Sequence, residues 1–304
     1  MAIRRLILCA AAVLALVAGC ARVPDLGITP LKPPTLAALQ NYLLSHKADV
    51  DQFRLRGPFA VTADINHEIR LSATDSIASD LFLAAPAGKA PLVIFMHGYA
   101  GTKESHTYQA MHVASWGMHS LAVQLPNSGS WSNNGKTLAR LVNFIYRSPE
   151  VIDSRIDVNK IILAGHSFGG TSVAIALAQG ARAAGGILLD PAGVGRDLPD
   201  FLRKISLPLL VLGADEHISE ARNRDYFYRF VRGGIAEVSI RGATHEDAQY
   251  PSQFAQTTEE SQISFMSALT AAAISLSATG KFDYAWASYG ADFENGKLFN
   301  PKTK

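Results

Sequence analysis

A serine between glycines stands at the end of an apolar run and before an alanine-rich segment. The apolar residues 160–165 lead into residues 165–170, GHSFGG, and the segment after them has the composition of a helix. A sharp strand–turn–helix of this kind exposes the serine hydroxyl, and its glycines let neighbouring backbones approach closely. The hydroxyl then lies at a helix N-terminus, where amides and the helix dipole favour developing negative charge. The pattern predicts that Ser167 is a nucleophile.

A second glycine-containing loop, residues 97–101 (HGYAG), directly follows the apolar run 91–96 (PLVIFM). A tetrahedral oxyanion needs two converging backbone N–H donors. Beside a nucleophile on a strand–turn–helix, one donor comes from the next residue, here Phe168, and the other from the loop after an earlier strand. We therefore expect Tyr99 to be the second donor, with its side chain facing the acyl pocket.

The expected general base is His245, in the segment 241–247 (RGATHED) after a predicted strand over 236–240. A neutral imidazole accepts the serine proton and later returns it to the leaving group. Glu246 and Asp247 are too close in sequence to reach round the ring, so we expect them to make local loop contacts.

The carboxylate that orients the imidazole has two possible positions along the chain. Asp190 ends the apolar segment 186–190 (GILLD), after the helix that follows Ser167. Asp215 or Glu216 follows the next apolar run, in residues 212–217 (LGADEH). The residues alone leave both positions open.

Five short apolar runs have the continuous pattern of strands that are buried on both faces of a parallel sheet. Helix-compatible segments alternate with them, which is typical of strand–helix–strand units. The sequence therefore predicts an α/β fold, with a central, mostly parallel sheet flanked by helices on both faces. The five runs are 91–96, 120–125, 160–165, 186–189 and 208–213, and the helical segments are 105–116, 136–148, 168–184 and 219–232.

The remaining sequence adds elements at both ends of this core. We expect a helix over about 35–45, one or two antiparallel strands within 59–82 and a closing helix over 258–277. Residues 281–304 show no clear periodicity, and we assign them no element.

Three segments together resemble the platelet-activating-factor acetylhydrolases: 165–170, 186–190 and 239–245 (SIRGATH). They are similar, more loosely, to chlorophyllases and to the polyester-cleaving cutinases, over roughly residues 91–247. The resemblance implies the α/β-hydrolase fold and a serine esterase or lipase-like enzyme. Such an enzyme cleaves carboxylic esters through an acyl-enzyme on Ser167 and needs no metal or organic cofactor.

The same families differ in where the acid lies. In the acetylhydrolases and chlorophyllases it follows the strand after the nucleophile helix, which maps onto Asp190. The cutinases place it after the next strand, nearer Asp215, and this is also the usual position in the fold. The spacings from Ser167 to Asp190 and on to His245 suit the acetylhydrolase pattern, so we expect Asp190, with Asp215 or Glu216 as the alternative.

Two departures limit what the resemblance implies about the substrate. Residues 191–193 (PAG) replace the aromatic residue that the acetylhydrolases carry after the acid, and no clear lipid-binding helices of their kind are present. The substrate therefore does not follow from the triad. Trp131, in the linker 124–134 after a predicted strand, either lines the pocket or covers its rim.

The rival functions differ in the catalytic residues that they require. A thioesterase or acyltransferase uses the same triad, and a non-catalytic envelope lipoprotein on a hydrolase scaffold predicts a missing triad member. A dehalogenase or epoxide hydrolase needs aspartate in place of Ser167 and is excluded.

The N-terminus predicts export. Arg4 and Arg5 precede an apolar run over 6–18 that is shorter than the roughly 20 residues needed to span a bilayer, and Cys20 follows small residues. This resembles the bacterial lipoprotein signal; an ordinary secretory signal peptide is the alternative. The residue after Cys20 is not aspartate, which implies the outer membrane of the cell envelope. We expect a signal peptide over 1–19, lipidation at Cys20, a proline-rich tether over 20–34 and a catalytic domain over 35–304.

Removal of this signal leaves an electrically neutral chain. Two of the 28 basic side chains belong to it and none of the 26 acidic ones, so 26 of each remain. Neutrality argues against nucleic acid as a partner and against a polybasic membrane patch. The expected partners are a small-molecule or polymeric ester and, through the lipid on Cys20, a membrane. Cys9 leaves with the signal, so a disulfide and a cysteine metal site are both excluded.

Overall fold

The computed structural model describes residues 35–47, 49–129, 131–218, 224–252 and 257–304. The predicted signal peptide (1–19), Cys20 and the tether (20–34) lie outside the described residues.

The described strands form one nine-stranded sheet in the order β1-β2-β4-β3-β5-β6-β7-β8-β9. Strands β3 to β8 are mutually parallel, whereas the pairs β1–β2, β2–β4 and β8–β9 are antiparallel. The mostly parallel sheet predicted from the apolar runs is confirmed. The strands are β1 (Val61–Arg70), β2 (Ser76–Ala84), β3 (Ala90–Met96), β4 (His119–Val123), β5 (Ile156–His166), β6 (Gly185–Leu189), β7 (Leu209–Gly213), β8 (Ile235–Ile240) and β9 (Leu298–Thr303).

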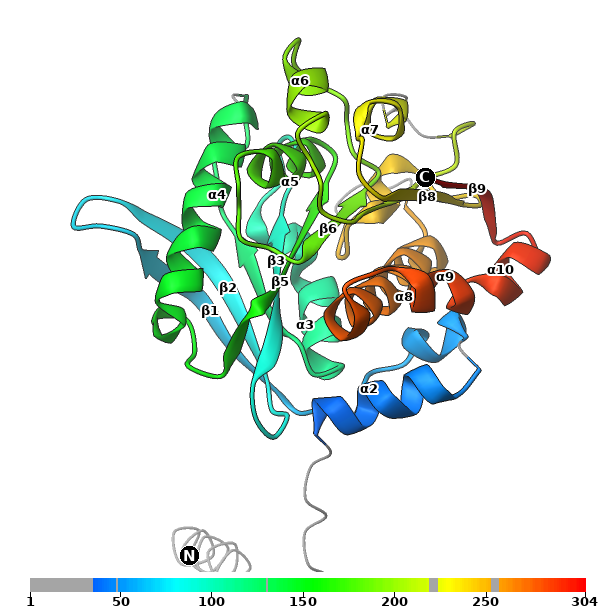
Figure 1. Cartoon of the computed structure of the whole chain (residues 1–304), viewed down its shortest axis with the longest axis horizontal. Coiled ribbons are helices and arrows are strands. Elements are labelled where there is room, and N and C mark those ends of the chain that lie inside the picture. The colour runs from blue at the N-terminus through cyan, green and yellow to red at the C-terminus, as the bar shows by residue number, and fades with distance from the viewer. Residues whose placement is uncertain (1–34, 48, 130, 219–223, 253–256) are drawn as a thin grey trace, which may run out of the picture. The chain divides into compact units, whose positions relative to one another are not determined.

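Helices cover both faces of this sheet (Figure 1). Every residue of β3 is buried, and its side chains alternate between two hydrophobic cores. Leu92 and Ile94 pack with helices α4 to α7, while Val93 and Phe95 pack with α2, α3 and α8. The helices are α2 (Leu36–Ser45), α3 (Thr107–Ser115), α4 (Trp131–Arg147), α5 (Phe168–Ala178), α6 (Leu198–Leu202), α7 (Asp225–Phe230), α8 (Glu259–Thr279), α9 (Asp283–Ser288) and α10 (Gly290–Glu294).

Helix α8 belongs to the core. Among the described residues it is the one helix whose length and composition suffice to cross a membrane, but most of it is buried inside the fold. Thr258 caps its first turn by accepting a hydrogen bond from the amide of Ser261 at 3.2 Å, and Gly280 ends it in the left-handed conformation. The apolar face predicted over 258–277 therefore packs against the sheet.

Two helices near the site differ from the sequence prediction. Helix α4 begins at Trp131 instead of residue 136, because Trp131 packs on the ring of Phe168 and its carbonyl accepts a hydrogen bond from Ser172. Helix α5 ends at Ala178 instead of residue 184. There Gly180 adopts a φ of 81°, and the amide of Ala181 returns to the carbonyl of Ala176 at 3.0 Å, which closes the last turn.

The C-terminal residues, to which the sequence assigned no element, form α9, α10 and β9. Strand β9 pairs with β8 at one edge of the sheet, and the backbone of Lys304 bonds to that of Ile235. At the other edge, the pairing of β1 with β2 shifts register between Asp64 and His67.

Candidate active site

Ser167 lies on the sharp turn between β5 and α5. Its φ of 53° and ψ of −122° are a strained backbone conformation for a residue with a side chain. The turn is held from two sides: its amide donates to the carbonyl of Leu189 at 3.1 Å, and its carbonyl accepts from the amides of Gly170 and Ala192, each at 3.0 Å. The conformation predicted for a nucleophile on a strand–turn–helix is present.

The glycines around Ser167 are required by close backbone contacts. A side chain at Gly169 would overlap the carbonyl oxygens of Met96 and His97, and one at Gly165 would lie 2.6 Å from the carbonyl oxygen of Gly169. The start of α5 thus packs directly against the end of β3, from which the predicted oxyanion loop leaves.

Asp190 and His245 lie together although 55 residues separate them. Nδ1 of His245 is 2.6 Å from Oδ2 of Asp190, and Asp190 is fully buried. A carboxylate in this position accepts the Nδ1–H and selects the tautomer whose Nε2 is unprotonated and can accept a proton. His166, the neighbour of Ser167, packs its ring at a tilt on that of His245 with centroids 4.5 Å apart, and its Nε2 donates to the His245 carbonyl at 3.0 Å. These contacts place His245 beside the serine turn.

The two alternative acids have their contacts elsewhere. Asp215 accepts hydrogen bonds from the amides of Gly242 at 3.1 Å and His217 at 3.2 Å, and so braces the loop after β8. Glu216 is half exposed and pairs with Arg224 at 3.1 Å. As predicted, Asp247 makes local contacts, since it accepts hydrogen bonds from the amides of Thr244 and Thr258.

The charge of Asp190 is maintained despite its burial. Burial by itself would raise its pKa, but the hydrogen bond and charge of His245, the charge of Arg224 and the amide of Ala214 together lower the pKa of Asp190 below its ordinary value. An ionised Asp190 is the state that orients an imidazole.

Arg224 is a residue of this site that the sequence analysis did not identify. Its guanidinium donates to Oδ1 of Asp190 at 2.9 Å. In the sequence it belongs to the segment 219–232, which is predicted to be a helix without any role at the site. The one available signal was Gly213 at the end of an apolar run, because a side chain there would lie 2.6 Å from Cζ of Arg224.

The loop 97–101 crosses the serine turn. A Cβ atom at Gly98 would lie 3.0 Å from Cβ of Ser167, so Tyr99 is one peptide away from this contact. Phe168 opens α5, and the first amides of a helix have no acceptor within it. Neither the Tyr99 amide nor the Phe168 amide has a hydrogen-bond acceptor among the described residues. Both predicted donors are therefore available next to Ser167.

Two polar side chains hold this loop, of which His97 is buried and Asn127 is partly buried. Nε2 of His97 lies 2.9 Å from the carbonyl oxygen of Leu125, and Asn127 donates to the carbonyl of Gly101 at 3.2 Å. The amide of Ala100, whose φ is 55°, donates to the carbonyl of Asn127 at 2.9 Å. The loop is thus fixed before any substrate arrives, as an oxyanion site requires.

Trp131, whose ring packs on that of Phe168, lines a cavity. The two rings pack with centroids 4.9 Å apart, and the Phe168 ring in turn lies 6.1 Å from that of Tyr99. The cavity measures about 240 Å³ and lies between the start of α4, the middle of α5 and the loop into α6. Its lining is mostly apolar and consists of Trp131, Ser132, Ile175, Val194, Gly195, Asp197, Leu198 and Phe201.

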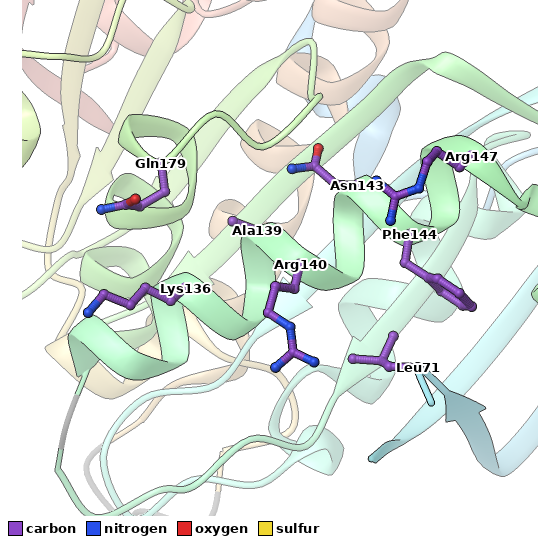
Figure 2. Close-up of a pocket in the computed structure, with 8 residues that line it drawn as sticks. All are labelled: Leu71, Lys136, Ala139, Arg140, Asn143, Phe144, Arg147 and Gln179. Atoms are coloured by element: carbon purple, nitrogen blue, oxygen red, sulfur yellow. The ribbon is translucent and has the colours of Figure 1, made fainter. Parts of the chain in front are cut away.

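A second hollow lies along α4. This groove of about 480 Å³ is lined by the basic side chains of Lys136, Arg140 and Arg147 together with Phe144 and Leu71, as Figure 2 shows. Arg140 is paired with Asp75 at 2.7 Å. None of the predicted site residues lines this groove.

Comparison with known proteins identifies a family and two similar proteins. A model of the alpha/beta hydrolase family matches residues 93–291. The chain is similar to Cutinase 1 of Thermobifida cellulosilytica, with 25% identity over 207 residues that cover 65% of this chain and 75% of that protein. It is also 25% identical over 207 residues to a cutinase of Thermobifida fusca (strain YX), covering 65% of each chain.

Proposed function

This chain belongs to the alpha/beta hydrolase family, and we propose that it is a serine hydrolase that cleaves carboxylic esters through an acyl-enzyme on Ser167. The observation that carries the proposal is the 2.6 Å contact between His245 and the buried Asp190, beside the strained turn of Ser167. The similarity to two cutinases supports an ester as substrate.

In the proposed reaction, Nε2 of His245 takes the proton of the Ser167 hydroxyl as its oxygen attacks the ester carbonyl carbon. The amides of Tyr99 and Phe168 stabilise the negative charge on the carbonyl oxygen. His245 then protonates the departing alkoxide, which leaves as an alcohol. Water, whose proton the same imidazole takes, attacks the acyl-enzyme; the imidazolium then returns that proton to the Ser167 oxygen as the carboxylic acid is released. Asp190 stabilises the imidazolium in both steps.

Labelling and turnover of the full-length protein test this proposal. We expect a fluorophosphonate probe to modify the protein stoichiometrically, because it phosphonylates an activated serine. We also expect p-nitrophenyl esters to be hydrolysed with a burst of p-nitrophenol equal to the labelled fraction. Turnover of acyl thioesters well above oxygen esters would favour a thioesterase. A folded protein that neither labels nor turns over any acyl substrate would contradict the proposal.

We further propose that the Trp131 cavity receives the apolar end of the substrate. For wild-type protein, kcat/KM should rise about fourfold per acyl methylene until the cavity is full, since burial of a methylene contributes about 0.8 kcal/mol. Val194→Phe, which fills the cavity, should remove this rise and leave acetate esters unaffected. Phe144→Ala in the groove along α4 is the control and should leave the profile unchanged. An unaltered profile in Val194→Phe would place the acyl chain elsewhere.

A further inference from the structure

Arg224 is a buried arginine whose guanidinium has four hydrogen-bond acceptors. Only 3% of its side chain is exposed. Besides Asp190 Oδ1 at 2.9 Å, its guanidinium donates to the carbonyl oxygen of Ala214 at 2.6 Å, the hydroxyl of Ser239 at 2.9 Å and Glu216 at 3.1 Å. These acceptors come from the ends of β6, β7 and β8. One side chain thus ties together the strand ends that carry both possible acid positions.

The site of Arg224 is built around charge. Glu237 is 1% exposed and its Oε1 lies 3.5 Å from Nε of Arg224, so two buried carboxylates face one guanidinium. Lys302 lies 3.3 Å from Glu237 and 3.5 Å from Asp225 and supplies the second positive charge. An isolated buried charge is costly, and such groups persist where they are paired and hydrogen-bonded. Together with His245, Arg224 offsets the cost of burying an ionised Asp190.

The division of the Asp190 oxygens is specific. Oδ1 is occupied by Arg224 and by the amide of Ala214, both at 2.9 Å, whereas Oδ2 lies 2.6 Å from His245. With Oδ1 held from two directions, the carboxylate has no freedom to rotate about its last bond. The oxygen that His245 needs is thereby fixed in place.

We propose that Arg224 is a positioning residue of the acyl-transfer site, which holds the carboxylate of Asp190 towards His245 and sets the proton affinity of the Asp190–His245 pair. The inference rests on the proposed function for its kinetic consequences. Its electrostatic part does not, because a fixed positive charge beside a titrating pair lowers the pair's proton affinity whether or not substrate is turned over.

The charged groups around the Asp190–His245 pair determine in which direction its titration midpoint should move when Arg224 is removed. Among the described residues, Arg224 is the arginine paired with Asp190; Glu216 and Glu237 pair with the Nη2 and Nε atoms of that guanidinium, and the ring of His166 packs at a tilt on His245. Burial lowers the pKa of His166 well below its ordinary value, so His166 is neutral. Removal of Arg224 leaves the negative charges without their partner, and a proton then binds to the pair more readily. The midpoint must therefore move to higher pH.

The test compares Arg224→Met and Arg224→Lys with wild type in the full-length protein. NMR titration of isotopically labelled histidine, with the His245 signal assigned from a His245→Asn variant, reports the pair directly. We expect the midpoint to rise by roughly 1 pH unit in Arg224→Met and to stay near wild type in Arg224→Lys, which keeps the charge. Arg241→Met is the matched control, since Arg241 approaches Asp215 and stacks on Phe299 instead.

Kinetics supply the positioning readout. Per fluorophosphonate-labelled site, which corrects for unfolded protein, kcat of Arg224→Met should fall about ten- to a hundredfold with KM nearly unchanged. The acid limb of its pH–rate profile should move upward with the NMR midpoint. An Arg224→Met protein with a wild-type midpoint and wild-type kcat per labelled site would show that Arg224 is merely structural. Wild-type protein that fails to label or turn over would count against the proposed function, while the NMR shift still decides the role of Arg224.

Discussion

Replacement of Ser167 by alanine should lower kcat/KM for a p-nitrophenyl ester by roughly 10³- to 10⁶-fold and abolish fluorophosphonate labelling. The hydroxyl is the atom to which the acyl group is transferred in the proposed reaction, and no neighbouring side chain replaces it. The φ of 53° at this position is retained by the surrounding hydrogen bonds, so the variant should fold. Ester hydrolysis by purified protein, with circular dichroism to verify folding, measures the effect.

Ser172→Ala is the matched control for this prediction. Ser172 is buried in the same helix, and its hydroxyl donates to the carbonyls of Trp131 and Phe168, each at 3.2 Å. Its removal costs a helix-to-helix hydrogen bond and leaves the serine turn intact, so labelling should persist. Persistence of labelling in Ser167→Ala would refute Ser167 as the nucleophile.

The second large effect is expected for Asp190→Asn, which should reduce kcat by about 10⁴-fold. An amide in this position no longer stabilises the imidazolium. It also allows the tautomer of His245 that carries its proton on Nε2, which cannot accept the serine proton there. It also leaves Arg224 facing a neutral group in a buried site. The rate should therefore fall although the side chain keeps its size and shape.

Asp215→Asn is the comparison that makes this result informative. The contacts of Asp215 go to the amides of Gly242 and His217, so its replacement should reduce kcat by no more than about tenfold. A large loss of kcat in Asp215→Asn, together with near-normal rates in Asp190→Asn, would show that Asp215 is the acid, at the position that is more usual in this fold. Rates per labelled site separate this outcome from a loss of folded protein.

The architecture could be predicted from the sequence because its strands carry an unambiguous pattern. Runs such as residues 91–96 are apolar at every position, and β3 is buried on both faces. The close packing of Gly169 on the end of β3 likewise follows from a motif in which glycine alone fits. We propose Ser167 and His245 as site residues from the sequence because each follows a strand at the same edge of the sheet.

Other features depend on tertiary contacts that no local pattern encodes. The proposal of Asp190 over Asp215 rests on the contact of Asp190 with His245, because in the sequence both are aspartates after apolar runs. The sequence does not indicate that Arg224 is buried, because its guanidinium fits only where Gly213 lacks a side chain. Helix α4 begins early because Trp131 packs on Phe168, although the residues after it are polar.

The edge strands of the sheet bear on how this protein behaves at high concentration. An exposed strand edge is a template on which another chain can pair and aggregate. Strand β1 interrupts such pairing with a register shift, where Asn66 has a φ of 62°, and it carries Asp64 and Glu68 on its exposed surface. At the opposite edge, β9 contains a proline, Pro301, which lacks an amide donor, followed by Lys302. Both edges therefore oppose strand addition, and a shortened chain without β9 would present β8, the strand that leads to His245, as a new edge for aggregation.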